Sequence, residues 1–296
     1  MEIIINIIRG ILIGVANVIP GVSGGTMAVS LGIYDKLISS ITGIRKHFKK
    51  SVIFLLQLFI GMGVGIIGFA YAIEFLFEKF PFPTAMAFIG LIIGGIPMMY
   101  DAWKTDLRRT RKKAGLGHAI AFLVLFLFAI ALPLIGTGAD ADLTTVNIGN
   151  IMILFFIGMI TSATMVIPGV SGSMVLLILG YYTSIIGEIT SFLGSLKAMD
   201  LVGLGHGFAV LTPFGVGVIV GIIVIAKIID WLLTYYCALT YSAILGLILA
   251  SPFAIFINQY QTGTLFLTVW SVVIGVILMI VSACLTFIMG NINREE

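Results

Sequence analysis

The residues best suited to binding chemistry form one short phrase that occurs twice. Residues 18–25 read VIPGVSGG and residues 166–173 read VIPGVSGS, 148 residues apart in a chain of 296. Proline ends a helix because it lacks a backbone donor, and glycine permits turns and the close approach of a ligand. The amide and hydroxyl groups left at such breaks are hydrogen-bond donors, which suit an anion such as phosphate. The phrase therefore predicts two matched anion-binding breaks.

Each copy places a serine where the next helix would begin. We expect Ser23 and Ser171 to cap helices whose N-termini point into the breaks and meet near mid-membrane. A competing interpretation is that the glycines and prolines only allow helices to pack closely. The candidate substrate-binding residues are Pro20, Gly21, Ser23, Gly24, Gly25, Thr26, Pro168, Gly169, Ser171, Gly172, Ser173 and Arg9.

Composition determines the class of protein that must position these residues. Sixty per cent of the residues are hydrophobic and ten per cent are charged, whereas a soluble domain carries about a quarter charged residues. The chain is therefore expected to be an all-α integral membrane protein. The three histidines and two cysteines show no metal-ligand spacing. We expect no metal, no cofactor and no nucleic-acid partner.

Hydropathy divides the chain into two similar halves, 1–147 and 148–296. Each half begins with an apolar region interrupted by the phrase, which we interpret as a re-entrant hairpin of two helices (3–18 with 24–42, and 148–166 with 172–190). Each half then has three stretches long enough to cross a bilayer. The expected crossings are 52–78, 83–100, 117–136, 207–235, 239–258 and 264–290.

Charge predicts the orientation of these segments. The loops at 43–50 and 101–116 carry 10 of the 16 basic residues, so the positive-inside rule places both of them, and both chain termini, in the cytoplasm. Three crossings per half make the second repeat inverted relative to the first, a plan common in secondary transporters. If each broken region instead crosses once, the repeats become parallel.

A few charged residues lie inside the apolar stretches, where charge is costly and therefore a functional candidate. Arg9 is one, although its side chain could instead extend to the membrane surface. Glu74 and Asp230 are related by an offset of 156 residues, which also aligns GLIIGGIP at 90–97 with GLILASP at 246–252. We expect one of these two acids to accept a proton and couple transport to the proton gradient.

The longer motif GVANVIPGVSGGTMAVSLGIYDKLI at 14–38, with SATMVIPGVSGSMVLLILGYY at 162–182, resembles the PopT family of polyprenyl-phosphate transporters. This family was formerly a bacterial membrane domain of unknown function. The resemblance covers the whole chain. It implies a carrier that returns undecaprenyl phosphate from the outer to the inner leaflet of the cytoplasmic membrane, where it is reused for peptidoglycan and other envelope polymers. Undecaprenyl phosphate and membrane lipids are then the expected partners.

Two other functions fit part of the sequence. Undecaprenyl-diphosphate phosphatase carries a related PGxSRxG phrase, but its arginine position is Gly24 here and Gly172 in the second copy, and no glutamate-rich motif accompanies either one. Catalysis would need groups that stabilise the transferred phosphoryl group and activate water. A transporter of a small soluble anion could use the same helix ends. A scaffold protein would explain the composition but not the duplicated break.

Overall fold

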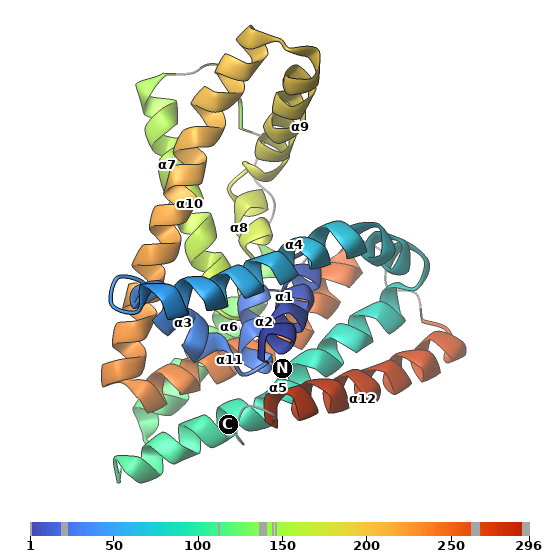
Figure 1. The fold of residues 1–296 in the computed structure, drawn as a ribbon. Helices are drawn as coiled ribbons and strands as arrows, with labels where there is room; N and C mark the ends of the chain where they lie inside the picture. Colours follow the sequence, from blue (N-terminus) through green and yellow to red (C-terminus); the bar gives the residue numbers. More distant parts are fainter. Residues whose placement is uncertain are drawn as a thin grey trace. The chain divides into compact units, whose positions relative to one another are not determined.

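The computed structural model describes residues 2–18, 23–111, 113–135, 141–143, 145, 147–261 and 267–291. All regular elements in these ranges are helices (Figure 1). The first half contains α1 (Glu2–Val18), α2 (Gly24–Ser30), α3 (Tyr34–Thr42), α4 (Phe48–Lys79), α5 (Pro81–Arg109), α6 (Leu116–Ala131) and the 3-10 turn η1 (Leu132–Leu134). The second half contains α7 (Ile148–Val166), α8 (Gly172–Ile178), α9 (Tyr182–Ala198), α10 (Leu201–Tyr235), α11 (Cys237–Gln261) and α12 (Val269–Asn291).

Seven of the described helices are long and apolar enough to cross a membrane, so the chain is a multi-pass membrane protein. Six of them, α4, α5, α6, α10, α11 and α12, coincide with the expected crossings. The seventh is α7, which we expected to be the first arm of a hairpin. At about 1.5 Å per residue its 19 residues are long enough to cross unaided. Its counterpart α1 is shorter, with an apolar segment at Ile3–Asn17.

The second arm of each expected hairpin is broken, which corrects the prediction of single helices over 24–42 and 172–190. Gly32 and Gly180, both with positive φ (69° and 78°), end α2 and α8. The amide of the residue after each glycine bonds back to a helix carbonyl, Ile33 to Ala28 and Tyr181 to Leu176. This is the Schellman ending that glycine permits. In the second copy it turns α8 into α9 through 106°.

The basic segment expected as a loop at 101–116 is mostly helical. α5 continues to Arg109, so its last two turns carry three of the basic residues that were assigned to the loop, Lys104, Arg108 and Arg109. The connection to α6 is correspondingly short. Positive residues near a helix C-terminus interact favourably with the carbonyl end of the helix dipole, which explains the extension.

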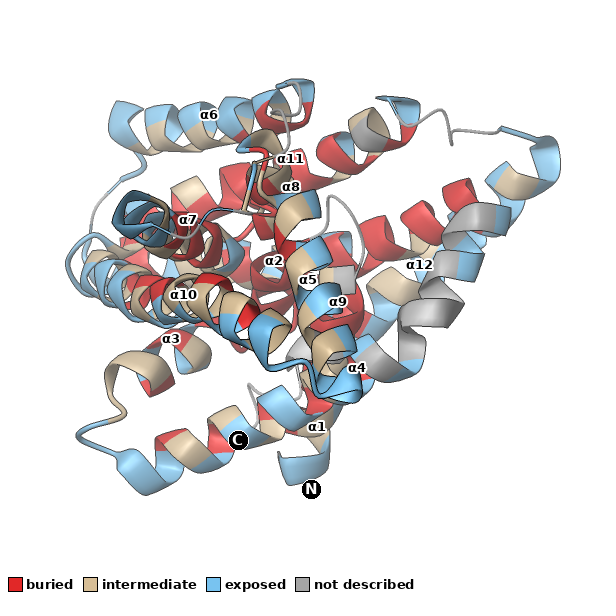
Figure 2. Cartoon of the chain, turned by 90° about the horizontal axis from the view of Figure 1, so that it is seen from above, coloured by how far each residue is buried: buried red, intermediate tan, exposed pale blue. Residues whose placement is uncertain are grey.

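The helices fall into two compact units, and each is described by itself. Unit 1 comprises Met1–Leu134, Ile167–Val170 and Ala226–Glu296. Its most buried spanning helices are α5 and α11 (Figure 2), with 72% and 61% of the most apolar window buried. α5 packs against α12, and α11 packs against α6. Gly90 and Gly94 of α5 permit the first contact, and Gly246 of α11 permits the second.

Unit 1 also contains a close pairing of α1 with α4 that depends on glycine (Figure 1). A Cβ at Gly10 would collide with the carbonyl oxygen of Leu58, and a Cβ at Gly61 with that of Ile7. Gly65 approaches the Ile11 carbonyl in the same way. Small residues let these backbones touch, as is common where helices associate within lipid.

Unit 2, comprising Ile135–Val166 and Ser171–Ile225, repeats that pairing between α7 and α10. A Cβ at Gly158 would meet the carbonyl of Phe214, one at Gly217 that of Phe155, and one at Gly221 that of Met159. These contacts correspond one by one to the α1–α4 contacts. Adding 148 to the number of each α1 residue and 156 to the number of each α4 residue gives the two residues in contact between α7 and α10. A small core of Leu154, Ile185 and Val210 completes the unit.

The sequence offset between matching residues of the two halves changes from 148 to 156 within one pair of helices. α2 and α8 have seven residues each, but α3 has nine and α9 has seventeen. The eight additional residues of α9 equal the change in offset. After them the helices correspond again, because α5 begins at Pro81 and α11 at Cys237, 156 residues later.

Candidate functional site

The first copy of the phrase leads into a completely buried helix. Pro20 and Gly21 lie outside the described residues. Ser23 precedes α2 with an extended backbone (φ −102°, ψ 131°), and all seven residues of α2, including Gly24, Gly25 and Thr26, are buried. This helix contacts α1 and α5. The hydroxyl-bearing residues of the first break therefore face protein.

The second copy of the phrase meets the first within unit 1. The backbone amide of Gly169 donates a hydrogen bond of 2.5 Å to Thr26 Oγ1. The Ser23 hydroxyl donates to the carbonyl of Ile167 at 3.5 Å. Residues Ile167–Val170 thus belong to unit 1, although the helices on either side of them lie in unit 2. The two segments thus exchange hydrogen bonds within one small region of unit 1, and a shared anion site there stays a prediction.

The two serines behave differently as caps. Ser171 begins α8 as predicted, because its hydroxyl accepts from the Met174 amide at 3.5 Å and pairs with Ser173 Oγ at 2.9 Å. Ser23 occupies the equivalent position but makes no side-chain cap bond, so that part of the prediction was wrong. Its hydroxyl is engaged with the second phrase instead.

Gly169 is required by the geometry of the second break. Its φ of +81° is a conformation that L side chains rarely adopt, and a Cβ there would lie 2.7 Å from the Leu247 side chain. Pro168 precedes it within the same turn, and Gly172 opens α8 where a Cβ would collide with Met165. The turn therefore directs the Gly169 amide at Thr26 by a conformation that alanine cannot easily copy.

The short lengths of α2 and α8 limit what the helix dipole can contribute. Each has only seven residues, so favourable electrostatics come from the unpaired amides of the first turn rather than from a long aligned stack. The direct hydrogen-bond donors are the Gly169 amide with the Ser23 and Thr26 hydroxyls in unit 1, and the Ser171 and Ser173 hydroxyls in unit 2.

Arg9 lies on α1 and is buried, with 3% of its surface exposed. Extension of its side chain to the membrane surface is therefore wrong as an explanation. One turn earlier on the same helix, Asn6 is also buried and donates to Gln57 of α4 at 2.8 Å. A guanidinium retained inside a membrane protein is costly unless it is paired. A role for Arg9 in binding the anion stays a prediction.

Comparison with known proteins identifies the family. The family model described as undecaprenyl phosphate translocase-like matches residues 13–268. The chain belongs to this family. It is 30% identical to a polyprenyl-phosphate transporter of Staphylococcus aureus over 296 residues, covering 99% of this chain and 98% of that protein. A polyprenyl-phosphate transporter of Vibrio cholerae is 28% identical over 258 residues, covering 82% and 74% respectively. No solved structure matches the chain.

The proton-coupling roles expected of Glu74 and Asp230 stay predictions. The side chain of Glu74 on α4 lies outside the described part of the structure. Asp230 is half-buried on α10, where its carbonyl accepts a bond from the Thr234 hydroxyl.

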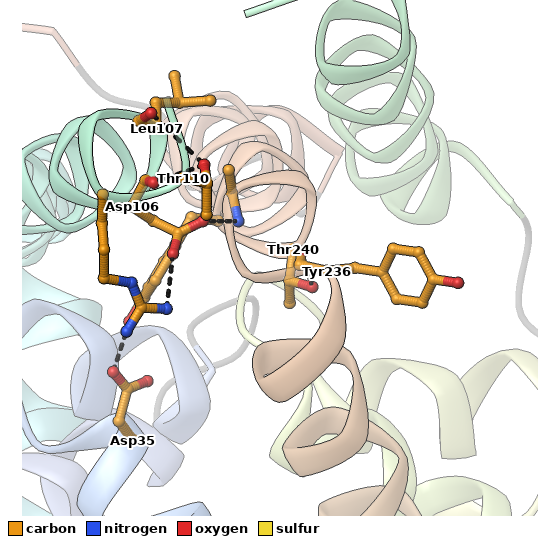
Figure 3. Close-up of polar contacts among 9 residues, drawn as sticks. Asp35, Asp106, Leu107, Thr110, Tyr236 and Thr240 are labelled. Atoms are coloured by element: carbon orange, nitrogen blue, oxygen red, sulfur yellow. Dashed lines mark hydrogen bonds and ion pairs between the residues drawn. The ribbon is translucent and has the colours of Figure 1, made fainter. Parts of the chain in front are cut away.

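The translocase-like chain has a second polar cluster that the sequence did not predict. Tyr241 of α11 donates its hydroxyl to Asp35 of α3 at 2.5 Å. Asp106 of α5 accepts from the Ala238 amide at 3.1 Å and from Arg109 at 3.0 Å. Figure 3 shows Asp35 and Asp106 approaching from different helices. The signal available in the sequence was the pair of acids beside apolar segments, but nothing in their spacing joined them.

A polar crevice adjoins this cluster. It has a volume of about 600 Å³ and is lined mainly by the last turns of α5 and the first turn of α11. Its lining includes Asp101, Lys104, Asp106, Arg108, Cys237 and Tyr241. On another side of α5, an apolar pocket of about 580 Å³ lies between α5, α6 and α11. The polar crevice is thus confined to the end of the bundle that carries the basic residues.

Proposed function

We propose that this protein is an undecaprenyl-phosphate translocase that returns the lipid carrier from the outer to the inner leaflet of the bacterial cytoplasmic membrane. Membership of the translocase-like family over most of the chain supports this function, as does a relative named polyprenyl-phosphate transporter that matches over nearly its full length. The structural observation that carries the proposal is the hydrogen bond between Gly169 and Thr26, which brings the two breaks together.

The phosphate head group is proposed to bind at this junction. A phosphate monoester needs several hydrogen-bond donors and is well served by backbone amides at helix starts. The Gly169 amide donates to Thr26 Oγ1. A phosphate oxygen would replace that hydroxyl as the acceptor, and Thr26 and Ser23 would then turn their own O–H groups toward the phosphate. Burial of α2 means that the helices must separate before the head group can enter.

Movement between leaflets is proposed to occur by alternating access between two inverted repeats. The matched helix order, the matched Schellman endings and the matched glycine contacts support a common architecture for the two halves. Three crossings after each broken region would invert the second half. The isoprenoid chain would remain in lipid while the phosphate crosses between the breaks.

Localisation and energy source complete the proposal. The basic ends of α3–α4 and α5–α6 would face the cytoplasm, together with both termini. One of Glu74 and Asp230 would accept a proton during the cycle, because a carboxyl group inside a membrane protein changes its charge readily when its surroundings change.

Reconstitution in liposomes tests this function directly. Purified protein in sealed vesicles containing undecaprenyl phosphate should make the lipid of one leaflet accessible to a reagent in the other, faster than empty vesicles do. Vesicles containing Gly169→Ala protein are the matched control, because that change alters the proposed site. Equal rates with wild-type and empty vesicles would contradict the proposal. Release of inorganic phosphate from undecaprenyl diphosphate in the same vesicles would instead support the phosphatase.

A further inference from the structure

The hydrogen bond between Tyr241 and Asp35 connects the first broken region to a spanning helix. Asp35 is the second residue of α3, which follows α2 through the turn at Gly32. Tyr241 lies one turn into α11 and is 6% exposed. The bond spans 206 residues of sequence. Any displacement of α2 and α3 away from α11 must break it.

The same bond has no equivalent in the other half. The offsets that match the two halves relate Asp35 to Thr183 and Tyr241 to Ala85. Alanine cannot donate a side-chain hydrogen bond, and threonine carries no charge. The contact therefore makes two otherwise similar halves unequal. Inverted repeats that differ in one such contact would also differ in the stability of their two open states.

The α11 side of the Tyr241–Asp35 hydrogen bond is held in place by α5. Asp106 of α5 accepts from the amide of Ala238 at the start of α11 and holds Arg109 on its other oxygen. Asp106 is itself buried. The start of α11 is thereby tied to α5, and α11 packs against both α5 and α6. α3, with nine residues and packing on α2 and α4, is the smaller partner and therefore the element able to move.

The surroundings allow the contact to open at low cost. Tyr241 lines the polar crevice of about 600 Å³, and Asp35 is exposed. When the partners separate, water in the crevice can satisfy both the phenol and the carboxylate, so neither is left buried and unpaired. Charged and titratable groups around the pair are Lys36 on α3, Cys237 on α11, and Asp106 and Arg109 on α5. Lys36 lies over the Phe54 ring of α4, 4.9 Å from its centroid.

We propose that the Tyr241–Asp35 hydrogen bond is a one-sided latch that ties α3, and through it α2, to α11 and opens once in each transport cycle. Both are positioning residues: they act through the placement of α2, which carries Thr26. This inference rests on the proposed function for the meaning of the cycle. The latch itself is a property of the helices and is measurable without any lipid.

Cys237 provides a native reporter, because it lines the crevice beside Tyr241. The other cysteine, Cys284, lies on α12 and is replaced by serine in the test protein. Tyr241→Phe removes the donor and keeps the ring. It should speed labelling of Cys237 by a membrane-impermeant maleimide by about tenfold, the population change expected from losing one charge-assisted bond. Tyr235→Phe, at an exposed position near the end of α10, is the matched control and should label at the wild-type rate.

Two further measurements separate a latch from a purely structural contact. Adding Asp35→Asn to Tyr241→Phe should produce little further acceleration, because both changes remove the same bond. In liposomes, Tyr241→Phe should alter the rate of lipid movement per folded protein molecule, which a general loss of folded protein would leave unchanged. Unchanged Cys237 labelling in folded Tyr241→Phe protein, or equal acceleration in Tyr235→Phe, would refute the latch. Accelerated labelling in protein that moves no undecaprenyl phosphate would retain the latch and reject the proposed function.

Discussion

The amide of Gly169 in the second copy of the repeated phrase hydrogen-bonds to the hydroxyl of Thr26, the residue that follows the first copy, across 143 residues of sequence. Thr26 is 1% exposed. A buried amide must find an acceptor, since leaving one unpaired costs about 1–3 kcal/mol. The repeated phrase thus acts as a pair, with one copy completing the hydrogen bonding of the other.

Replacing Thr26 by valine should impair transport and folding together. Valine has the same shape but no acceptor, so the Gly169 amide would be left unpaired at a cost of about 1–3 kcal/mol. We expect at least about a tenfold loss in the rate of lipid movement for the corresponding loss of a donor to the phosphate. Thr26→Ser should retain most activity, and Thr190→Val on the exposed face of α9 should change neither quantity. Full transport by Thr26→Val would show that this hydroxyl has no role in binding.

Alanine substitutions along α4 and α10 should distinguish glycines that contact the facing helix from glycines that do not. Gly61 and Gly217 touch the facing helix, whereas a Cβ at Gly63 or Gly215 would enter open space. Gly61→Ala and Gly217→Ala should each lower the free energy of unfolding by about 1–3 kcal/mol through overpacking. Gly63→Ala and Gly215→Ala should be neutral or stabilising by up to about 1 kcal/mol, because alanine favours a helix. Unfolding of detergent-solubilised protein measures these differences, and equal effects at all four positions would refute the assignment.

Asp106 should contribute more to stability than its ion-pair partner. Its carboxylate caps the start of α11, and losing such a cap costs about 0.5–2 kcal/mol. Arg109 is 74% exposed at its side chain, so the ion pair itself is worth little, about 0–1 kcal/mol. Asp106→Ala should therefore lower the unfolding temperature clearly, and Arg109→Gln only slightly. A larger loss in Arg109→Gln would assign the effect to the ion pair.

Neutralising Glu74 and Asp230 together should remove the dependence of transport on the proton gradient. Glu74→Gln with Asp230→Asn preserves size while preventing proton exchange. Wild-type vesicles with an imposed pH difference should move lipid faster than vesicles without one, and the double variant should not respond. Glu78→Gln on α4 is a control for loss of a carboxylate near the same helix end. Unchanged transport and unchanged pH dependence in the double variant would reject both acids as coupling groups.

The sequence predicted the parts of the structure that depend on composition and periodicity. Long apolar runs predicted the crossing helices, and the duplicated phrase marked both breaks. The second breaks at Gly32 and Gly180 were missed because a single glycine within an apolar run is compatible with either a helix or its end. The capping role of Ser171 was correct. The capping role predicted for Ser23 was wrong, because its hydroxyl donates to the carbonyl of Ile167, 144 residues away.

Contacts between distant segments explain the rest of what could not be predicted. Nothing near Asp35 in sequence indicates Tyr241, and nothing near Ala238 indicates Asp106, because these bonds depend on how α3, α5 and α11 pack. The burial of Ser23 and Ser171 also determines which substitutions can test them. A bulky apolar residue at Ser23 or Ser171 would disturb the fold, since these sites are 4% and 6% exposed. Alanine is the appropriate replacement for testing their hydroxyl groups.

The eight residues that lengthen α9 relative to α3 have a consequence for the history of the chain. With the Schellman endings in register before them and α5 and α11 in register after them, one ancestral half-length gene, copied in tandem and extended once, accounts for the arrangement through α11. At about 1.5 Å per residue the extension adds roughly 12 Å to one helix. A protein with those residues excised would have α3 and α9 of equal length and would approximate the ancestor.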